Sequence, residues 1–105
     1  MLGSVQLVAH RGFAREAPEN TLAAVAHAAD AGANAVEVDV RAASDGTPIV
    51  VHDATVDRVT DAAGTVADFD PGELAGLDVL ESGEGVPTLA AVLDAASDRG
   101  LAVNV

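Results

Sequence analysis

The chain has 105 residues, 50% hydrophobic and 21% charged, and its 5 basic and 17 acidic residues give a net charge of −12. The basic residues are scattered arginines, so no basic stripe is present to bind nucleic acid or an anionic membrane. No apolar run approaches the roughly 20 residues that span a bilayer, and no signal-peptide pattern is present, which predicts a cytoplasmic protein without a membrane anchor. The absence of cysteine excludes disulfides, thiolate metal sites and cysteine nucleophiles.

The acidic composition has two interpretations. The acid excess, the absence of lysine and a core of small residues resemble halophilic proteins, whose carboxylate surfaces stay hydrated in molar salt. An acidic soluble protein from a GC-rich genome has the same composition. Both interpretations concern solubility and leave the chemistry open.

The first predicted elements are a strand and a helix. Residues 5–10 form an apolar run that ends in His-Arg-Gly, which predicts a buried strand followed by a turn. Asn20 or Thr21 is expected to cap a helix that runs to about Ala31, with Gly32 at its C-terminal end. Its inward face is expected to carry Leu22, Val25, Ala26 and Ala29.

Two further apolar runs follow this helix. Residues 35–40 alternate between apolar and acidic side chains, which predicts a strand with Glu37 and Asp39 on one face. Residues 49–52 form a third run and end at His52.

The connection between these two runs has only eight residues, 41–48, too few for a crossover helix. If Asp45 and Gly46 form a two-residue hairpin turn, Asp39 pairs with His52. If the chain instead loops back without a helix, the two residues lie at the carboxyl ends of neighbouring parallel strands. Both geometries place His52 next to Asp39.

The second half of the chain is predicted to be mostly loop before a final helix and strand. Residues 53–86 are polar and rich in glycine and aspartate, with a short helix near residues 71–75. Residues 87–97 predict an amphipathic helix, and residues 101–105 begin a strand. The inward face of this helix is expected to carry Leu89, Val92, Leu93 and Ala96. The order of elements predicts an α/β fold with a largely parallel sheet.

Polar groups follow each of the first three predicted strands, and strand ends share one rim in a parallel barrel. These groups are His10 with Arg11, Glu37 with Asp39, and His52 with Asp53. Two carboxylates suit Mg²⁺ or Ca²⁺, two histidines suit proton transfer, and an arginine suits a phosphate. Each also has a plain alternative: a structural histidine, a solvated strand face, or, for Arg11, an ion pair, and Glu19 and Asp53 could simply cap turns. Their joint occurrence favours a catalytic site.

Four ordered motifs closely resemble the N-terminal signature of the glycerophosphodiester phosphodiesterase family. They are VAHRG at residues 8–12, PENT at 18–21, EVDV at 37–40 and VHD at 51–53. Further similar segments occur at residues 58–60, 64–66, 73–74 and 87–89, so the resemblance covers nearly the whole chain.

The resemblance implies a (β/α)₈ barrel of TIM type that hydrolyses glycerophosphodiesters, small-molecule substrates of lipid and glycerol metabolism, to an alcohol and glycerol 3-phosphate. It implies a catalytic acid and base pair, His10 and His52, with neither role assigned between them, and attack by the substrate's glycerol hydroxyl through a cyclic phosphate. Glu37 and Asp39 match the ligands of a divalent cation, Mg²⁺ or Ca²⁺. Arg11 matches the arginine that binds the phosphate, and the resemblance places Glu19 beside the substrate, orienting His10 or Arg11.

The length departs from this pattern, because such a barrel has about 250 residues. In the family a third acidic ligand follows Asn and an apolar residue, and this chain ends with Asn104 and Val105. We interpret residues 1–105 as a partial domain with about three or four barrel strands, expected to be inactive and to self-associate when isolated. The alternatives are a non-catalytic half-barrel that serves as an interaction module and a relative of phosphatidylinositol-specific phospholipase C; the PENT motif disfavours the latter.

Overall fold

The computed structural model describes residues 19–105 and, for residues 8–10, the backbone alone. The strands are β1 (Val8–His10), β2 (Ala35–Glu37), β3 (Val40–Ala42), β4 (Pro48–Val50) and β5 (Ala102–Asn104). The helices are α1 (Leu22–Asp30), α2 (Pro71–Ala75) and α3 (Leu89–Asp98), with 3₁₀ turns η1 (Val66–Asp68) and η2 (Val79–Glu81). None of the helices in this part of the chain is long and apolar enough to cross a membrane.

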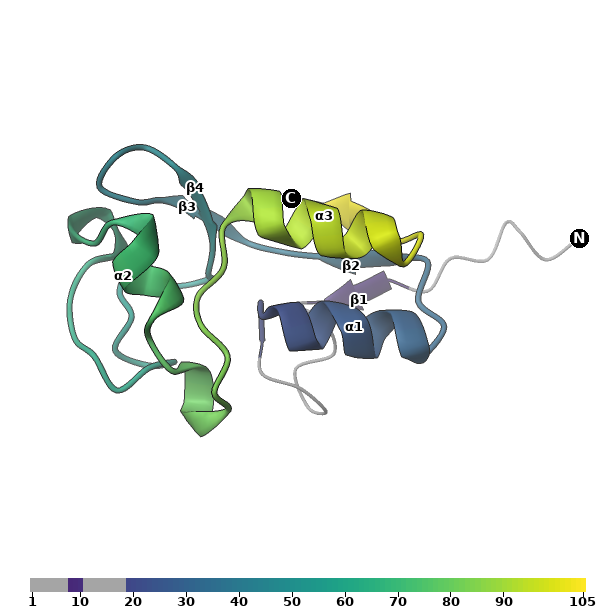
Figure 1. Ribbon diagram of the computed structural model, residues 1–105, viewed down its shortest axis with the longest axis horizontal. Coiled ribbons are helices and arrows are strands. Elements are labelled where there is room, and N and C mark those ends of the chain that lie inside the picture. Colours follow the sequence, from purple (N-terminus) through teal and green to yellow (C-terminus); the bar gives the residue numbers. More distant parts are fainter. Residues whose placement is uncertain (1–7, 11–18) are drawn as a thin grey trace, which may run out of the picture.

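A three-stranded parallel sheet in the order β1-β2-β5 forms one part of the fold. The helices α1 and α3 contact each other beside this sheet (Figure 1). Val36 and Val38 pack into a core with side chains of both helices, such as Val25 and Val92. Because side chains alternate along a strand, Glu37, which lies between the two valines, belongs to the face away from this core. The parallel α/β architecture predicted from the sequence is therefore confirmed.

The helix ends follow from local capping. The hydroxyl of Thr21 accepts a hydrogen bond from the backbone amide of Ala24 at 3.1 Å, so Thr21 rather than Asn20 caps α1. Thr88 caps α3 in the same way, which starts this helix at Leu89 instead of residue 87. Asp70 and Glu73 form a reciprocal capping box on α2, in agreement with the predicted short helix.

The inward faces of the two long helices match the prediction only in part. Val25 in α1 and Val92 and Ala96 in α3 are buried as expected, whereas Leu22 and Leu93 are exposed. Each helix therefore buries fewer of its apolar residues than their spacing in the sequence predicts.

The predicted strand over residues 35–40 is divided between two sheets. The amide of Val38 still donates to Asn104 of β5, whereas the carbonyl of Asp39 accepts from Val51. The chain thus leaves the parallel sheet at this point and continues into the antiparallel β3–β4 hairpin. The alternative with neighbouring parallel strands is wrong, because the third apolar run returns antiparallel to β3.

The hairpin turn has three residues, 44–46, and not the two predicted. The amide of Ala43 donates to Thr47, the Asp45 carboxylate accepts from the Thr47 amide at 2.9 Å, and Gly46 adopts a φ of 87°. This arrangement shifts the strand register by one residue, so that Val40 pairs with Val50. By extension of this ladder, Asp39 lies opposite Val51 rather than His52.

Residues 53–86 also differ from the predicted polar loop, because they contribute to a second apolar core. This core lies beneath the hairpin at the end of the molecule away from β1 (Figure 1). Its fully buried members include Ile49, Val56, Val66, Leu74 and Val86. The second core fixes the base of the hairpin, where His52 and Asp53 lie.

Candidate active site

The carboxyl ends of the three parallel strands lie at one level. The register pairs His10 of β1 with Glu37 of β2, and Glu37 in turn with Asn104 of β5. The backbone therefore brings His10 and Glu37 together at the predicted rim. The predicted phosphate ligand Arg11 and the side chain of His10 lie outside what the structure describes.

Asp39 lies just beyond the end of β2 and is half-buried. The side-chain amide of Asn20 donates to its Oδ2 at 3.3 Å. Asn20 is 5% exposed, and its Oδ1 is buried without a hydrogen-bond partner among the described residues. A carboxylate beside an unsatisfied amide oxygen provides the hard oxygen donors that Mg²⁺ and Ca²⁺ prefer.

The fit to a divalent cation is consistent but partial. Glu37 is the last residue of β2, Asp39 lies two residues further along the chain, and both are carboxylates. Among the described residues, no group of three or more ligating side chains forms. These two residues would hold the cation on this side of the rim.

His52 lies in the same region, two residues beyond the end of the return strand β4. Its Nδ1 lies 2.7 Å from Oδ1 of Asp53, and its side chain is 43% exposed. A groove of about 330 Å³ is lined by both Asp39 and His52, together with Val38, Val40, Arg41 and Val105. The predicted proximity of His52 and Asp39 is confirmed, although neither predicted geometry produces it.

Arg41 and the strand pairing hold His52 from its backbone side. Nε and one terminal nitrogen of Arg41 donate to the carbonyl of His52 at 3.1 and 3.0 Å. The neighbouring amide of Val51 donates to the Asp39 carbonyl at 3.0 Å. These bonds leave the imidazole ring free to be positioned by its own side-chain contacts.

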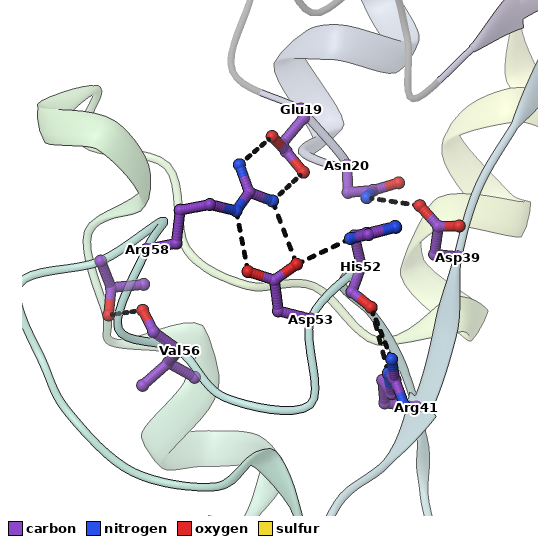
Figure 2. Close-up of polar contacts among 9 residues, drawn as sticks. Glu19, Asn20, Asp39, Arg41, His52, Asp53, Val56 and Arg58 are labelled. Carbon is purple, nitrogen blue, oxygen red and sulfur yellow. Dashed lines mark hydrogen bonds and ion pairs between the residues drawn. The ribbon is translucent and has the colours of Figure 1, made fainter.

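Those contacts form a hydrogen-bonded network of four side chains, which are Glu19, Arg58, Asp53 and His52 (Figure 2). Arg58 donates to Asp53 through Nε at 2.8 Å and to both oxygens of Glu19 at 2.8 Å each. Asp53 in turn contacts His52. Glu19 is 9% exposed, so the end of this network that is furthest from His52 lies in the interior.

The charges in this network stabilise one another. The hydrogen bonds from Arg58 and then from His52 lower the pKa of the Asp53 carboxyl group from 3.8 to about 2. The carboxylates of Glu19 and Asp53 raise the pKa of the Arg58 guanidinium above its ordinary value. Asp53 is therefore a carboxylate, and Arg58 a cation, at neutral pH.

Sequence reasoning finds Glu19 and Asp53 but not the residue that joins them. The resemblance predicts that Glu19 orients His10 or Arg11, which stays a prediction, and the described contacts show that Glu19 also accepts two hydrogen bonds from Arg58. Arg58 stands out in the sequence only as part of a similar segment, because an ion pair across 39 residues leaves no periodic signal. The sequence suggests Asn20 only as a helix cap and gives no sign of its contact with Asp39.

The fold and the site together define part of an α/β barrel with its polar groups at the carboxyl ends of the strands. Among solved structures, the chain is similar to an Oleispira antarctica phosphodiesterase in complex with the product sn-glycerol-3-phosphate. The TM-score is 0.89 and the identity 36%, over 95% of this chain and 43% of that structure. A glycerophosphodiester phosphodiesterase from Agrobacterium tumefaciens superposes with a TM-score of 0.87 and 39% identity, over 94% of this chain and 45% of that structure.

The model of the glycerophosphoryl diester phosphodiesterase family matches residues 10–105. The chain belongs to this family, as its four motifs indicate. A glycerophosphodiester phosphodiesterase of Caldanaerobacter subterraneus subsp. tengcongensis is 40% identical over 94% of this chain and 43% of that relative. Human glycerophosphodiester phosphodiesterase 1 is 52% identical over 62% of this chain and 20% of that relative. The chain thus spans less than half the length of these proteins.

Proposed function

We propose that this chain supplies the N-terminal part of the active site of a glycerophosphodiester phosphodiesterase, which releases an alcohol and glycerol 3-phosphate. The observation that carries this proposal is the groove shared by Asp39 and His52 at the carboxyl end of the parallel sheet. It joins an acidic side chain suited to a cation with an imidazole suited to proton transfer. Family membership and the product bound to the Oleispira relative support the same reaction.

Glu37 and Asp39 are proposed to hold the divalent cation, Mg²⁺ or Ca²⁺. When bound, such a cation neutralises charge on the phosphoryl oxygens. The side-chain amide of Asn20 donates to one oxygen of Asp39 and so orients this carboxylate.

His10 and His52 are proposed to exchange the protons of the reaction. One accepts a proton from the attacking hydroxyl, and the other donates a proton to the departing alcohol oxygen. Arg11 is proposed to bind the phosphate through its guanidinium group. The cytoplasmic location expected from the sequence stays a prediction.

The test is hydrolysis of glycerophosphocholine by the full-length protein that carries this chain, with added Mg²⁺ or Ca²⁺. Glu37→Gln and Asp39→Asn should each abolish cation-dependent activity. His10→Ala and His52→Ala should each lower the rate by about 10²–10⁴-fold. Asp30→Asn, at the exposed end of α1, serves as the control and should retain full activity.

Three outcomes would contradict the proposal. Unchanged activity and cation titration in Asp39→Asn would remove the metal assignment. Preferential cleavage of phosphatidylinositol would favour the phospholipase C alternative. A folded full-length protein without any hydrolysis would favour the interaction module.

A further inference from the structure

We propose that Asp53, Arg58 and Glu19 are positioning residues that hold His52 as the Nδ1–H tautomer and leave its Nε2 as the atom that exchanges a proton with the substrate. The use of that proton in phosphodiester cleavage rests on the function proposed above. The tautomer itself depends only on the contacts within this chain.

The tautomer follows from the contact between His52 and Asp53. Their Nδ1 and Oδ1 atoms are 2.7 Å apart, a distance typical of a strong hydrogen bond to a charged acceptor. An ionised carboxylate has no proton to donate, and the low pKa of Asp53 keeps it ionised. Nδ1 must therefore carry the hydrogen, and the lone pair of the neutral ring lies on Nε2.

The orientation of the ring agrees with this assignment. In Figure 2 the second ring nitrogen of His52 points away from Asp53, toward the side where Asp39 lies. This is the side of the groove that both residues line. When Nε2 accepts a proton, the positive charge of the ring lies against the Asp53 carboxylate, which stabilises it.

Arg58 fixes the position of Asp53 and is not free to bind a phosphate. Its Nε and one terminal nitrogen donate to the two oxygens of Asp53, at 2.8 and 3.4 Å. Both terminal nitrogens also donate to Glu19, one to each of its carboxylate oxygens, at 2.8 Å each. Four of the five N–H groups of the guanidinium are thereby used within the chain.

Glu19 anchors this arrangement in the interior. It is buried, whereas the Arg58 side chain is 48% exposed and would otherwise sample many rotamers. Glu19 lies in the segment before α1, and Asp53 and Arg58 lie after the hairpin, so the ion pairs hold two distant segments together. The neighbouring Asn20 contacts Asp39. Residues 19 and 20 thus connect to His52 through Asp53 and Arg58, and directly to the proposed cation ligand Asp39.

A purely structural role for these ion pairs makes a different prediction. If they only join the two segments, their loss lowers stability but leaves the His52 tautomer and the chemical step of the folded enzyme unchanged. The side-chain nitrogen shifts of His52 distinguish the two roles, because they report directly which ring nitrogen carries hydrogen.

The experiment records these shifts in the full-length protein at a pH where the ring is neutral, with His52→Gln used to assign the signals. The wild-type protein should show hydrogen on Nδ1. Asp53→Asn should convert the ring partly or fully to the Nε2–H form, since an amide can donate to Nδ1. Arg58→Met should give a mixture of the Nδ1–H and Nε2–H forms. Arg58→Lys keeps the positive charge but cannot bind both carboxylates at once, so its fraction of the Nε2–H form should lie between those of the wild type and Arg58→Met.

The control is Asp61→Asn, which removes an exposed carboxylate that lines the same pocket as Arg58 but takes no part in the contacts among Glu19, Arg58, Asp53 and His52. It should leave the tautomer and the rate unchanged. In activity, Asp53→Asn should lower kcat by about 10²-fold or more with little change in KM. Arg58→Lys should lose less than Arg58→Met.

An Nε2–H ring in the wild-type protein, or an unchanged tautomer in Asp53→Asn, would overturn the proposal. This readout is independent of the reaction. An inactive protein with an Asp53-dependent Nδ1–H ring would refute the phosphodiesterase function and keep the positioning role. An active protein with the other tautomer would do the reverse.

Discussion

Asp53 gains two donors from opposite sides, and this has consequences for stability at low pH. The ion pair with Arg58 favours the ionised carboxylate in the folded state, where its pKa is about 2 against an ordinary 3.8. A lowered folded-state pKa stabilises the protein above the unfolded-state value. This contribution declines as the pH falls below about 3.8 and is lost as it passes through about 2.

We therefore predict that Arg58→Met raises the pKa of Asp53 toward its ordinary value, which a carbon-13 titration of the side-chain carboxyl group would measure. The free energy of unfolding should be lower than in the wild type at neutral pH, and the difference should shrink as the pH falls toward 2. Asp61→Asn is the matched control. A pKa that stays near 2 in Arg58→Met would show that His52 alone holds the carboxylate ionised.

Some residues of the site can be predicted from the sequence, whereas the contacts that hold them cannot. Glu37, Asp39, His52 and Asp53 are recognisable because each follows an apolar run, and strand ends converge in a parallel sheet. The bond from Asn20 to Asp39 and the pairing of Glu19 with Arg58 join loops, whose paths depend on tertiary packing. No local pattern encodes such contacts.

At the scale of elements, capping and periodicity predict the three α-helices, whereas they miss the hairpin register and the second core. The register depends on one residue of loop length, since a three-residue turn replaces the two-residue turn that Asp45 and Gly46 indicate. The second core draws on valines and leucines separated by irregular, Gly- and Asp-rich segments. Without a period of 2 or 3.6, these residues resemble a loop.

Two glycines test how the turn and the second core are held. Gly46 has a φ of 87° and open space where a β-carbon would stand, so Gly46→Ala should cost about 1–2 kcal/mol of conformational strain. At Gly85 a β-carbon would lie 2.0 Å from the carbonyl oxygen of Ala75, beside the bond from Val86 to Leu74. We expect Gly85→Ala to be the more destabilising of the two in urea unfolding. Equal losses would mean that residues 84–86 shift to relieve the contact.

At the scale of the whole molecule, the chain exposes surfaces that isolated domains normally cover. Within the described residues, β1 and β5 each pair with a neighbouring strand on one side only. Leu93 on α3 is 46% exposed and Leu80 is 51% exposed. Unpaired strand edges and exposed leucines favour association, while a net charge of −12 opposes it.

The balance between these two effects depends on salt, because screening shortens the range of repulsion from about 10 Å at 0.1 M to about 3 Å at 1 M ionic strength. We predict that the isolated 105-residue chain self-associates and that its average mass in sedimentation equilibrium rises with salt. Leu93→Glu should lower that mass at high salt, whereas Asp30→Asn, which removes one repulsive charge without adding apolar surface, should raise it slightly. A monomer at every salt and protein concentration would mean that the unpaired edges and leucines are too small a surface to hold two acidic chains together.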